Sequence, residues 1–411
     1  MNKHKTYEHM KPDHVPEDLF IPGNIWGTWG GDPRVDFKKL LGGRDIVFMA
    51  EHYHAGHSDQ GMWLVASAEG NRQVLLDAET FTSSGVKVFS RLLGGDLVFF
   101  PVETDPPLHG KYRNIIAPFF TPPSIAKLKD VITKRVDDML DELLPKGRCD
   151  FTTEFGNLFP ASIFLDIVGL PQDRKSEFLD WAHTAMSDPD AQKKRTAMQN
   201  IGDYLMEEVL SRRETPRNDL LSHIINSEVF GRPVTPEEAT GCAVVLFLGG
   251  LDTVATHLSW VFRYLAENQE VQDLLRKEPK KIPEVNEEMF RFFSAVFLTR
   301  QALRDVEVAG AMIKKGDIVA CCLPMANHDE QDLKDADVLD IDRSKKRHLA
   351  FGYGPHICVG MHLARLEMNI VLERWLARVH NIRIDGAYEP TSYVGNVMKL
   401  NSVPLTWSLI N

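Results

Sequence analysis

The stretch FGYGPHICVG, from Phe351 to Gly360, places one cysteine, Cys358, among three glycines, a proline and a histidine. Glycine allows a backbone to approach a bulky neighbour closely. Helical sequence resumes directly after Cys358, so the N-terminal N–H groups of a helix would face the sulfur and stabilise its thiolate form. A thiolate with no second cysteine nearby suits a haem iron better than a zinc ion. The alternative is an ordinary cysteine buried in a turn.

The bulk composition limits the classes of protein that are consistent with this loop. The chain has 411 residues, 43% of them hydrophobic, and a net charge of −11, which disfavours general nucleic-acid binding. Its five cysteines are irregularly spaced and include no CxxC pair, which argues against a disulfide framework or a cysteine-rich zinc site. The longest apolar run, 243–251, is far shorter than the ~20 residues that span a bilayer. We expect a soluble, cytoplasmic protein without membrane or nucleic-acid partners.

The hydrophobic periodicity predicts a mostly helical protein with minor sheet, of the α+β class. We expect a single domain over 1–411. Its helix-rich bulk should lie at about 105–300 and 359–380, and its β-rich parts near 45–70 and 301–325.

One long helix is marked especially clearly. Thr235, Pro236 and Glu238 form a capping box with a proline in the first turn, and good helical residues continue to about Asn268. At ~1.5 Å per residue this helix would be roughly 50 Å long and would cross the whole domain. Gly249-Gly250 lies in its middle, where each glycine costs ~1 kcal/mol relative to alanine. The pair therefore predicts a close approach or a local bulge.

The cysteine loop resembles the haem-ligand loop of the cytochromes P450, which are haem–thiolate monooxygenases. The six positions that carry the likeness are Phe351, Gly352, Gly354, His356, Cys358 and Gly360. The resemblance covers nearly the whole chain. It is closest to the soluble bacterial camphor 5-monooxygenase group, to which GGLDTV (249–254), DPP (105–107) and VPLTW (403–407) are similar.

This resemblance implies the family's triangular, mostly helical fold, with haem b (iron protoporphyrin IX) between the long helix and the cysteine loop. Cys358 would be the axial ligand of the iron, His356 would hydrogen-bond a haem propionate, and Phe351 would pack beside the thiolate.

Asp252 and Thr253 follow the two glycines of the long helix. The resemblance implies an acid–alcohol pair in a widened turn, where Thr253 stabilises iron-bound dioxygen and Asp252 relays protons from solvent. Cleavage of an O–O bond requires protons on the outer oxygen, so an acid beside a hydroxyl makes chemical sense. Alternatively, Thr253 only bonds back to the preceding turn and Asp252 faces solvent.

Two further motifs match the family. Glu288 and Arg291 stand where its buried ExxR pair stands, which implies a structural role, although an i,i+3 pair is common on any helix. His109 and Arg113 lie one turn apart on one helix face, and they match propionate-binding positions, as does Arg300. Taken alone, each of these residues is typical of a surface charge.

The camphor enzyme orients its ketone with a tyrosine, and Leu97 falls at that place here. We expect a small-to-medium, mostly apolar substrate, such as a monoterpene, a norisoprenoid or a related cyclic terpenoid, held by shape. The predicted pocket residues, which could equally be ordinary core, are Val88, Leu97, Phe99, Val102, Val245, Leu248, Val296, Val397 and the polar Asn396.

The sequence contains no flavin or nicotinamide fingerprint and no second cysteine cluster. We therefore expect electrons from separate proteins, which by resemblance are a [2Fe–2S] ferredoxin and an NADH-dependent ferredoxin reductase, with O2 as co-substrate and a monomeric enzyme. Lys345-Lys346-Arg347 is either a solvated face or a docking patch for an acidic donor. The rival functions are a peroxide-driven peroxygenase and a non-catalytic haem sensor, and the presence of Asp252 and Thr253 argues against both.

Overall fold

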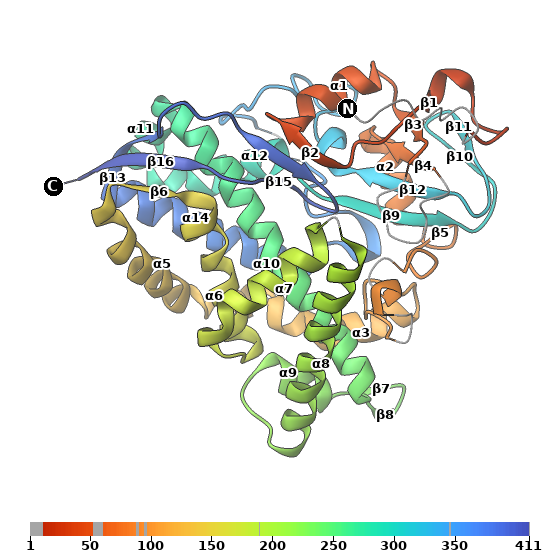
Figure 1. Cartoon of the computed structure of the whole chain (residues 1–411), viewed down its shortest axis with the longest axis horizontal. Helices are drawn as coiled ribbons and strands as arrows, with labels where there is room; N and C mark the ends of the chain where they lie inside the picture. The colour runs from red at the N-terminus through yellow and green to blue at the C-terminus, as the bar shows by residue number, and fades with distance from the viewer. Residues whose placement is uncertain are drawn as a thin grey trace.

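The computed structural model describes residues 11–51, 61–87, 90–93, 97–188, 190–344 and 347–410. Helices fill most of the molecule, and the largest sheet lies to one side, at the upper right of Figure 1. The predicted class, mainly α with minor β, is confirmed. The expectation that 1–411 forms one domain with the stated helix-rich and β-rich ranges stays a prediction.

Helix α10 (Pro236–Glu267) crosses the centre of the molecule, as predicted (Figure 1). The Thr235 hydroxyl accepts a hydrogen bond from the Glu238 N–H at 3.2 Å, and the Glu238 carboxylate accepts one from the Thr235 N–H at 2.8 Å. Among the described residues, α10 is the one helix long and apolar enough to cross a bilayer. Because 67% of its most apolar window is buried, it is the central helix of the core.

The two glycines of α10 have different surroundings. A Cβ atom added to Gly250 would lie 2.4 Å from the ring of Phe164 on α6 (Leu158–Val168), so only glycine allows these helices to approach so closely. Gly249 faces open space. The close approach is therefore present, but the expected bulge is not, since α10 is one unbroken α-helix.

Helices α7, α8 and α14 pack against α10, and further helices that position the site pack on these or on the cysteine loop. Helix α14 lies against both α5 and α12, and α7 lies against α8. Their bounds are α2 (Ala68–Leu76), α3 (Leu108–Ile116), α5 (Lys129–Leu143), α7 (Lys175–Ser187), α8 (Ala191–Glu214), α12 (Ile282–Phe292) and α14 (Met361–Arg378).

The largest sheet has six strands in the order β1-β3-β4-β12-β9-β5. The strands are β1 (Phe20–Ile21), β3 (Ile46–Met49), β4 (Met62–Val65), β12 (Ile318–Cys322), β9 (Phe297–Ala302) and β5 (Phe81–Thr82).

Two smaller sheets contain the C-terminal strands. One has the order β13 (Val379–Ile384), β16 (Pro404–Leu409), β6 (Arg148–Asp150), and the other β15 (Met398–Leu400), β14 (Thr391–Val394), β2 (Gly27–Gly30). A single bridge between Val296 and Val397 brings the start of β9 against the segment before β15. Residues a hundred positions apart thus meet beside α10.

Candidate active site

The loop that carries Cys358 is shaped by its glycines. Gly352 and Gly354 have φ values of 76° and 70°, a region that glycine enters without strain. A Cβ atom on Gly354 would lie 2.4 Å from the carbonyl oxygen of Leu75, so the loop lies directly on α2. The Cys358 N–H donates to the Phe351 carbonyl at 2.8 Å, and α14 begins three residues later.

The Cys358 side chain is exposed and lines a cavity of about 380 Å³. Thr253 and Gly249 of α10 line the same cavity. Burial raises the pKa of the Cys358 thiol, while a hydrogen bond from the Gly360 N–H and the positive charge of Arg113 act in the opposite direction. The helix start therefore opposes the effect of burial on the thiol pKa but does not outweigh it, and the thiolate form stays a prediction.

Four basic side chains gather in the wall of this cavity or close to it. His109 and Arg113 come from α3, Arg300 from β9, and His356 from the cysteine loop. The rings of His109 and His356 lie 4.1 Å apart between centroids. Arg113 donates to the Ile357 carbonyl at 2.5 Å and Arg300 to the Thr299 carbonyl at 2.8 Å, so both are held by backbone. Arg300 does not line the cavity itself but lies close behind it.

The electrostatics of this basic cluster favour an anion. Burial, followed by Arg113 and Arg300, lowers the pKa of His109 to about 4. Burial, followed by Arg300, His109 and Arg113, lowers the pKa of His356 to about 2. The Nε2 atom of His109 is buried and has no hydrogen-bond partner among the described residues. Two arginines and an open ring nitrogen beside a lone thiol fit the two propionates of a haem.

Glu288 and Arg291 are both fully buried and form a fork-to-fork pair, with N–O distances of 2.7 and 2.9 Å. Arg291 also donates to the carbonyl oxygens of Asn327, Ala336 and Val338, at 2.6 to 3.0 Å. These bonds fasten α12 to the long segment that leads to the cysteine loop.

Sequence reasoning missed the third member of this network. Arg343 donates to Glu288 at 3.0 Å and to three carbonyl oxygens between residues 334 and 338. The role of Arg343 could not be predicted from a single sequence, because Arg343 lies in an irregular segment and its partner Glu288 lies 55 residues earlier.

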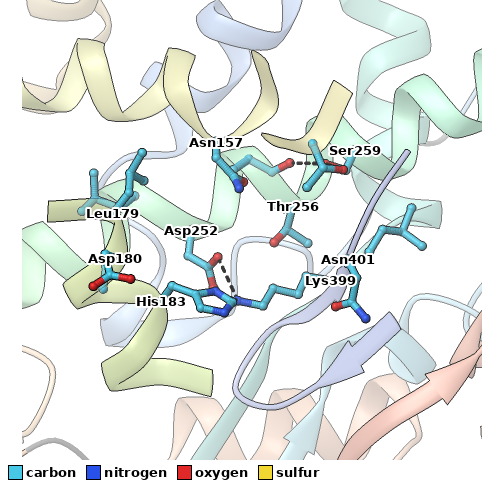
Figure 2. Close-up of a pocket in the computed structure, with 14 residues that line it drawn as sticks. Asn157, Leu179, Asp180, His183, Asp252, Thr256, Ser259, Lys399 and Asn401 are labelled. Atoms are coloured by element: carbon cyan, nitrogen blue, oxygen red, sulfur yellow. Dashed lines mark hydrogen bonds and ion pairs between the residues drawn. The ribbon is translucent and has the colours of Figure 1, made fainter. Parts of the chain in front are cut away.

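Thr253 and Asp252 lie on different sides of α10. Thr253 lines the Cys358 cavity and donates to the Gly249 carbonyl at 3.0 Å. Asp252 lines a second cavity, of about 570 Å³, where it pairs with Lys399 of β15 at 3.5 Å (Figure 2).

Lys399 also contacts His183 of α7, with 3.3 Å between its Nζ atom and the ring Nδ1 atom (Figure 2). Burial and the charge of Lys399 lower the pKa of His183, which favours a neutral ring that accepts this hydrogen bond. Asp252 is therefore tied into a polar cluster and is neither free in solvent nor directed at Cys358. Neither Lys399 nor His183 was predicted, because both lie far from Asp252 along the chain.

The predicted substrate-pocket residues divide into two groups. Val102, Val245, Val296 and Val397 line the Cys358 cavity. Phe99 and Leu248 instead belong to the neighbouring hydrophobic core, and Leu97 packs against that core. Asn396 is not among the residues that line the cavity. Val88, Lys345 and Lys346 lie outside the described residues.

The correction for Leu97 and its neighbours has a simple cause. Counting from a distant motif fixes a position along the chain but not the direction of the side chain. A buried apolar residue therefore looks the same whether it faces a cavity or a core.

Two buried ionisable groups of the cavity wall were not predicted. His257 stacks on Phe290 with ring centroids 4.1 Å apart, and burial, with Arg34 and His348, lowers its pKa to about 3. Glu367 of α14 is buried without a charged partner among the described residues, and burial raises its pKa to about 8. Both line the cavity beside the cysteine loop.

A lone thiol facing a long helix, with a basic cluster at the cavity edge, is the arrangement of a haem–thiolate protein. Comparison with known proteins agrees. The family described as "Cytochrome P450" matches residues 175–382. A relative from Sinorhizobium fredii, "Probable cytochrome P450 127A1", is 34% identical over 405 residues, 97% of each chain. "Cytochrome P450-terp" from a Pseudomonas species is 29% identical and covers 93% of this chain and 96% of its own.

Two solved structures, of CYP101J2 and CYP101C1, each superpose with a TM-score of 0.85 at 29% identity. They cover 97% of this chain and at least 99% of theirs. This chain belongs to the cytochrome P450 family. It is a cytochrome P450 monooxygenase, an oxidoreductase whose cofactor is a haem with a cysteine thiolate as axial ligand. When bound, that haem supplies the activation of O2.

Proposed function

We propose that this enzyme hydroxylates a small-to-medium, mostly apolar molecule of the terpenoid type, using O2 and two electrons from a ferredoxin. The observation that carries the substrate class is the wall around Thr253. Val102, Val245, Val296 and Val397, whose side chains are wholly apolar, line the same cavity as Thr253. Such a wall selects by shape, at ~1–3 kcal/mol per methylene, so several related substrates should bind. A related protein of Mycobacterium tuberculosis is named a steroid C26-monooxygenase, so steroids are the competing cyclic class that the test must separate from terpenoids.

Cys358 is the proposed axial ligand, because it is the free cysteine that lines this cavity. The proposed anchors for the haem propionates are His109, Arg113, Arg300 and His356. Their support is the surplus of positive charge and the unpartnered Nε2 atom of His109. Phe351 is proposed to pack beside the Cys358 thiolate, Gly360 caps the helix that follows the sulfur, and Glu288 and Arg291 are proposed to hold the fold.

Thr253 and Asp252 are the proposed catalytic pair. The Thr253 hydroxyl now donates to the Gly249 carbonyl, and a rotation about χ1 would let it donate into the cavity. Asp252 must leave Lys399 and turn around α10 before it can pass a proton to that hydroxyl. The proton therefore enters from the second cavity and passes through Asp252 to the Oγ1 atom of Thr253, a residue that lines the cavity where O2 would bind.

The proposed electron donor is a separate [2Fe–2S] ferredoxin, reduced by an NADH-dependent reductase. The likeness to CYP101-type structures supports this system. Arg347, the described residue of the predicted docking patch, is exposed and pairs with Asp332. We further propose a monomeric enzyme in the cytoplasm, in line with the bacterial relatives.

The test is a titration of the ferric enzyme with a panel of monoterpenes, norisoprenoids, fatty acids and steroids, read by the Soret shift that accompanies loss of water from the iron. Tight, saturable shifts with cyclic terpenoids, followed by hydroxylated product with NADH, ferredoxin and reductase, would support the proposal. A preference for fatty acids or steroids would overturn the substrate class. Product formed from peroxide alone would indicate a peroxygenase. Binding without NADH consumption by any ligand would indicate a sensor.

A further inference from the structure

Arg365 of α14 lies over the first residue of the cysteine loop. Its guanidinium carbon is 4.6 Å from the centroid of the Phe351 ring, within the range of a cation–π contact. The Phe351 carbonyl in turn accepts the N–H of Cys358 at 2.8 Å. A fixed positive charge is thus held one aromatic ring away from the ligand backbone.

The orientation of Arg365 is fixed by a carboxylate on another helix. Glu287 of α12 accepts two hydrogen bonds from Arg365, from Nε and, at 3.0 Å, from Nη2. His348 lies 3.2 Å from the same carboxylate. Burial opposes ionisation of Glu287, but the bonds from His348 and Arg365 outweigh it and lower its pKa to about 2. A bidentate pair of this kind sets the plane of the guanidinium as well as its place.

Among the residues that the structure describes, two cationic side chains favour the thiolate form of Cys358, those of Arg113 and Arg365. Arg113 belongs to the basic cluster whose charge a bound dianion would offset. Arg365 instead forms an ion pair with Glu287 and does not line the Cys358 cavity. The side chains of Arg365 and Glu287 are 30% and 27% exposed, so solvent screens their fields only in part.

We propose that Arg365 is a positioning residue whose positive charge stabilises the negative charge of the Cys358 thiolate and thereby raises the reduction potential of the bound haem. The negative charge of Glu287 should have the opposite effect on that potential. The inference rests on the proposed role of Cys358. Reduction adds one electron from an external reductant, and no proton need move. A nearby positive charge favours the more electron-rich reduced state, and a nearby negative charge disfavours it. Removing the charge of Arg365 should therefore favour the ferric form, and removing the charge of Glu287 should favour the ferrous form.

The test is a spectroelectrochemical titration of the substrate-free holoenzyme with dithionite and mediators, without any redox partner protein. We expect Arg365→Gln to shift the ferric–ferrous equilibrium about three- to tenfold toward ferric, where tenfold corresponds to about 59 mV. Arg365→Lys should shift it less, because the charge remains while the fork is lost. Glu287→Gln should shift it toward ferrous.

Arg374→Gln is the matched control. Arg374 stands on the same helix in a similar bidentate pair with Asp137, at 2.8 and 2.9 Å, and its replacement should leave the potential unchanged. Equal shifts in Arg365→Gln and Arg374→Gln, or no shift in either, would overturn the proposal. If Arg365→Gln fails to retain haem, Arg365→Lys and Glu287→Gln still test the proposal. Reduction potentials that shift in the same direction in these two variants would contradict it.

The reduced CO spectrum of the unmodified enzyme separates this inference from the proposed function. Without the thiolate band in that spectrum, the assignment of Cys358 fails. With the band present and the potential unmoved by the variants, only the role of Arg365 fails.

Discussion

Asp252 and Thr253 are neighbours in the chain, yet their side chains line different cavities on different sides of α10. Thr253 faces the Cys358 cavity, and Asp252 is paired with Lys399 in the polar cavity behind the helix (Figure 2). The helix therefore forms a wall between a polar chamber that holds the acid and an apolar chamber that holds the thiol. Their proposed roles predict different effects when each is replaced.

Thr253→Ala should keep NADH consumption but lose coupling to product. Without the Thr253 hydroxyl, the proposed donor that directs protons to the bound oxygen is lost. The reduced oxygen should therefore leave as peroxide. We expect most of the electrons to appear in peroxide, measured as peroxide and product formed per NADH. Thr253→Ser keeps a hydroxyl and should keep most of the coupling. Unchanged coupling in Thr253→Ala would remove the proposed role.

Asp252→Asn should slow turnover without changing substrate affinity. Loss of a positioned acid costs on the order of 100-fold in rate, and Asp252 does not line the substrate cavity. The measurements are kcat, the kinetic solvent isotope effect and the substrate Kd from the Soret shift. A large change in Kd with normal kcat would show that Asp252 acts on the cavity shape and not on protons.

Arg291→Lys should destabilise the fold strongly. It breaks a fully buried pair and leaves Glu288 and several carbonyl oxygens short of donors, which costs about 3–5 kcal/mol. The expected result is a much lower Tm and poor haem retention.

The control for this variant is Lys134→Gln, which removes a surface i,i+4 pair with Asp138. The side chains of Lys134 and Asp138 are 74% and 54% exposed, so losing their pair should change stability by less than ~1 kcal/mol. Equal losses of Tm in Arg291→Lys and Lys134→Gln would contradict the structural role of the buried pair.

Glu367 should make stability depend on pH. Burial raises its pKa to about 8 in the folded protein, whereas an unfolded glutamate has a pKa of about 4.3. Between these values the folded state keeps a proton that the unfolded state has released. The stabilisation is therefore fully present below pH ~4.3 and falls as pH rises toward 8, by ~1.4 kcal/mol per unit.

Glu367→Gln should remove this slope. The measurement is Tm of the haem-loaded protein from about pH 5 to about pH 8, the window between the two pKa values. The Tm of Glu367→Gln relative to that of the unmodified protein should increase steadily as pH rises. Parallel Tm curves would show that Glu367 keeps an ordinary pKa.

Much of the fold could be predicted from local signals. The capping box at Thr235 marked the start of α10, and the glycine-rich loop around Cys358 marked the turn before α14. Both signals are short and contiguous, so one sequence contains them completely. The unbroken path of α10 past Gly249 could not be predicted, because it depends on how closely the Phe164 ring approaches Gly250.

The site was harder to predict wherever it depends on contacts across the fold. Lys399 reaches Asp252 from β15, and Arg343 reaches Glu288 from an irregular segment. Counting along the chain places Leu97 in the pocket, but it is partly buried, packs against the neighbouring core and does not line the Cys358 cavity. Side-chain direction and distant ion pairs arise from packing, which residue spacing alone does not encode.

The central claim is that Cys358 binds the haem iron as a thiolate. The most direct measurement is the absorption spectrum of the reduced CO complex of Cys358→His beside that of the unmodified enzyme. We predict a red-shifted Soret band in the unmodified enzyme and its loss in the variant, since an imidazole does not donate charge as a thiolate does. A red-shifted band that persists in Cys358→His would contradict the assignment.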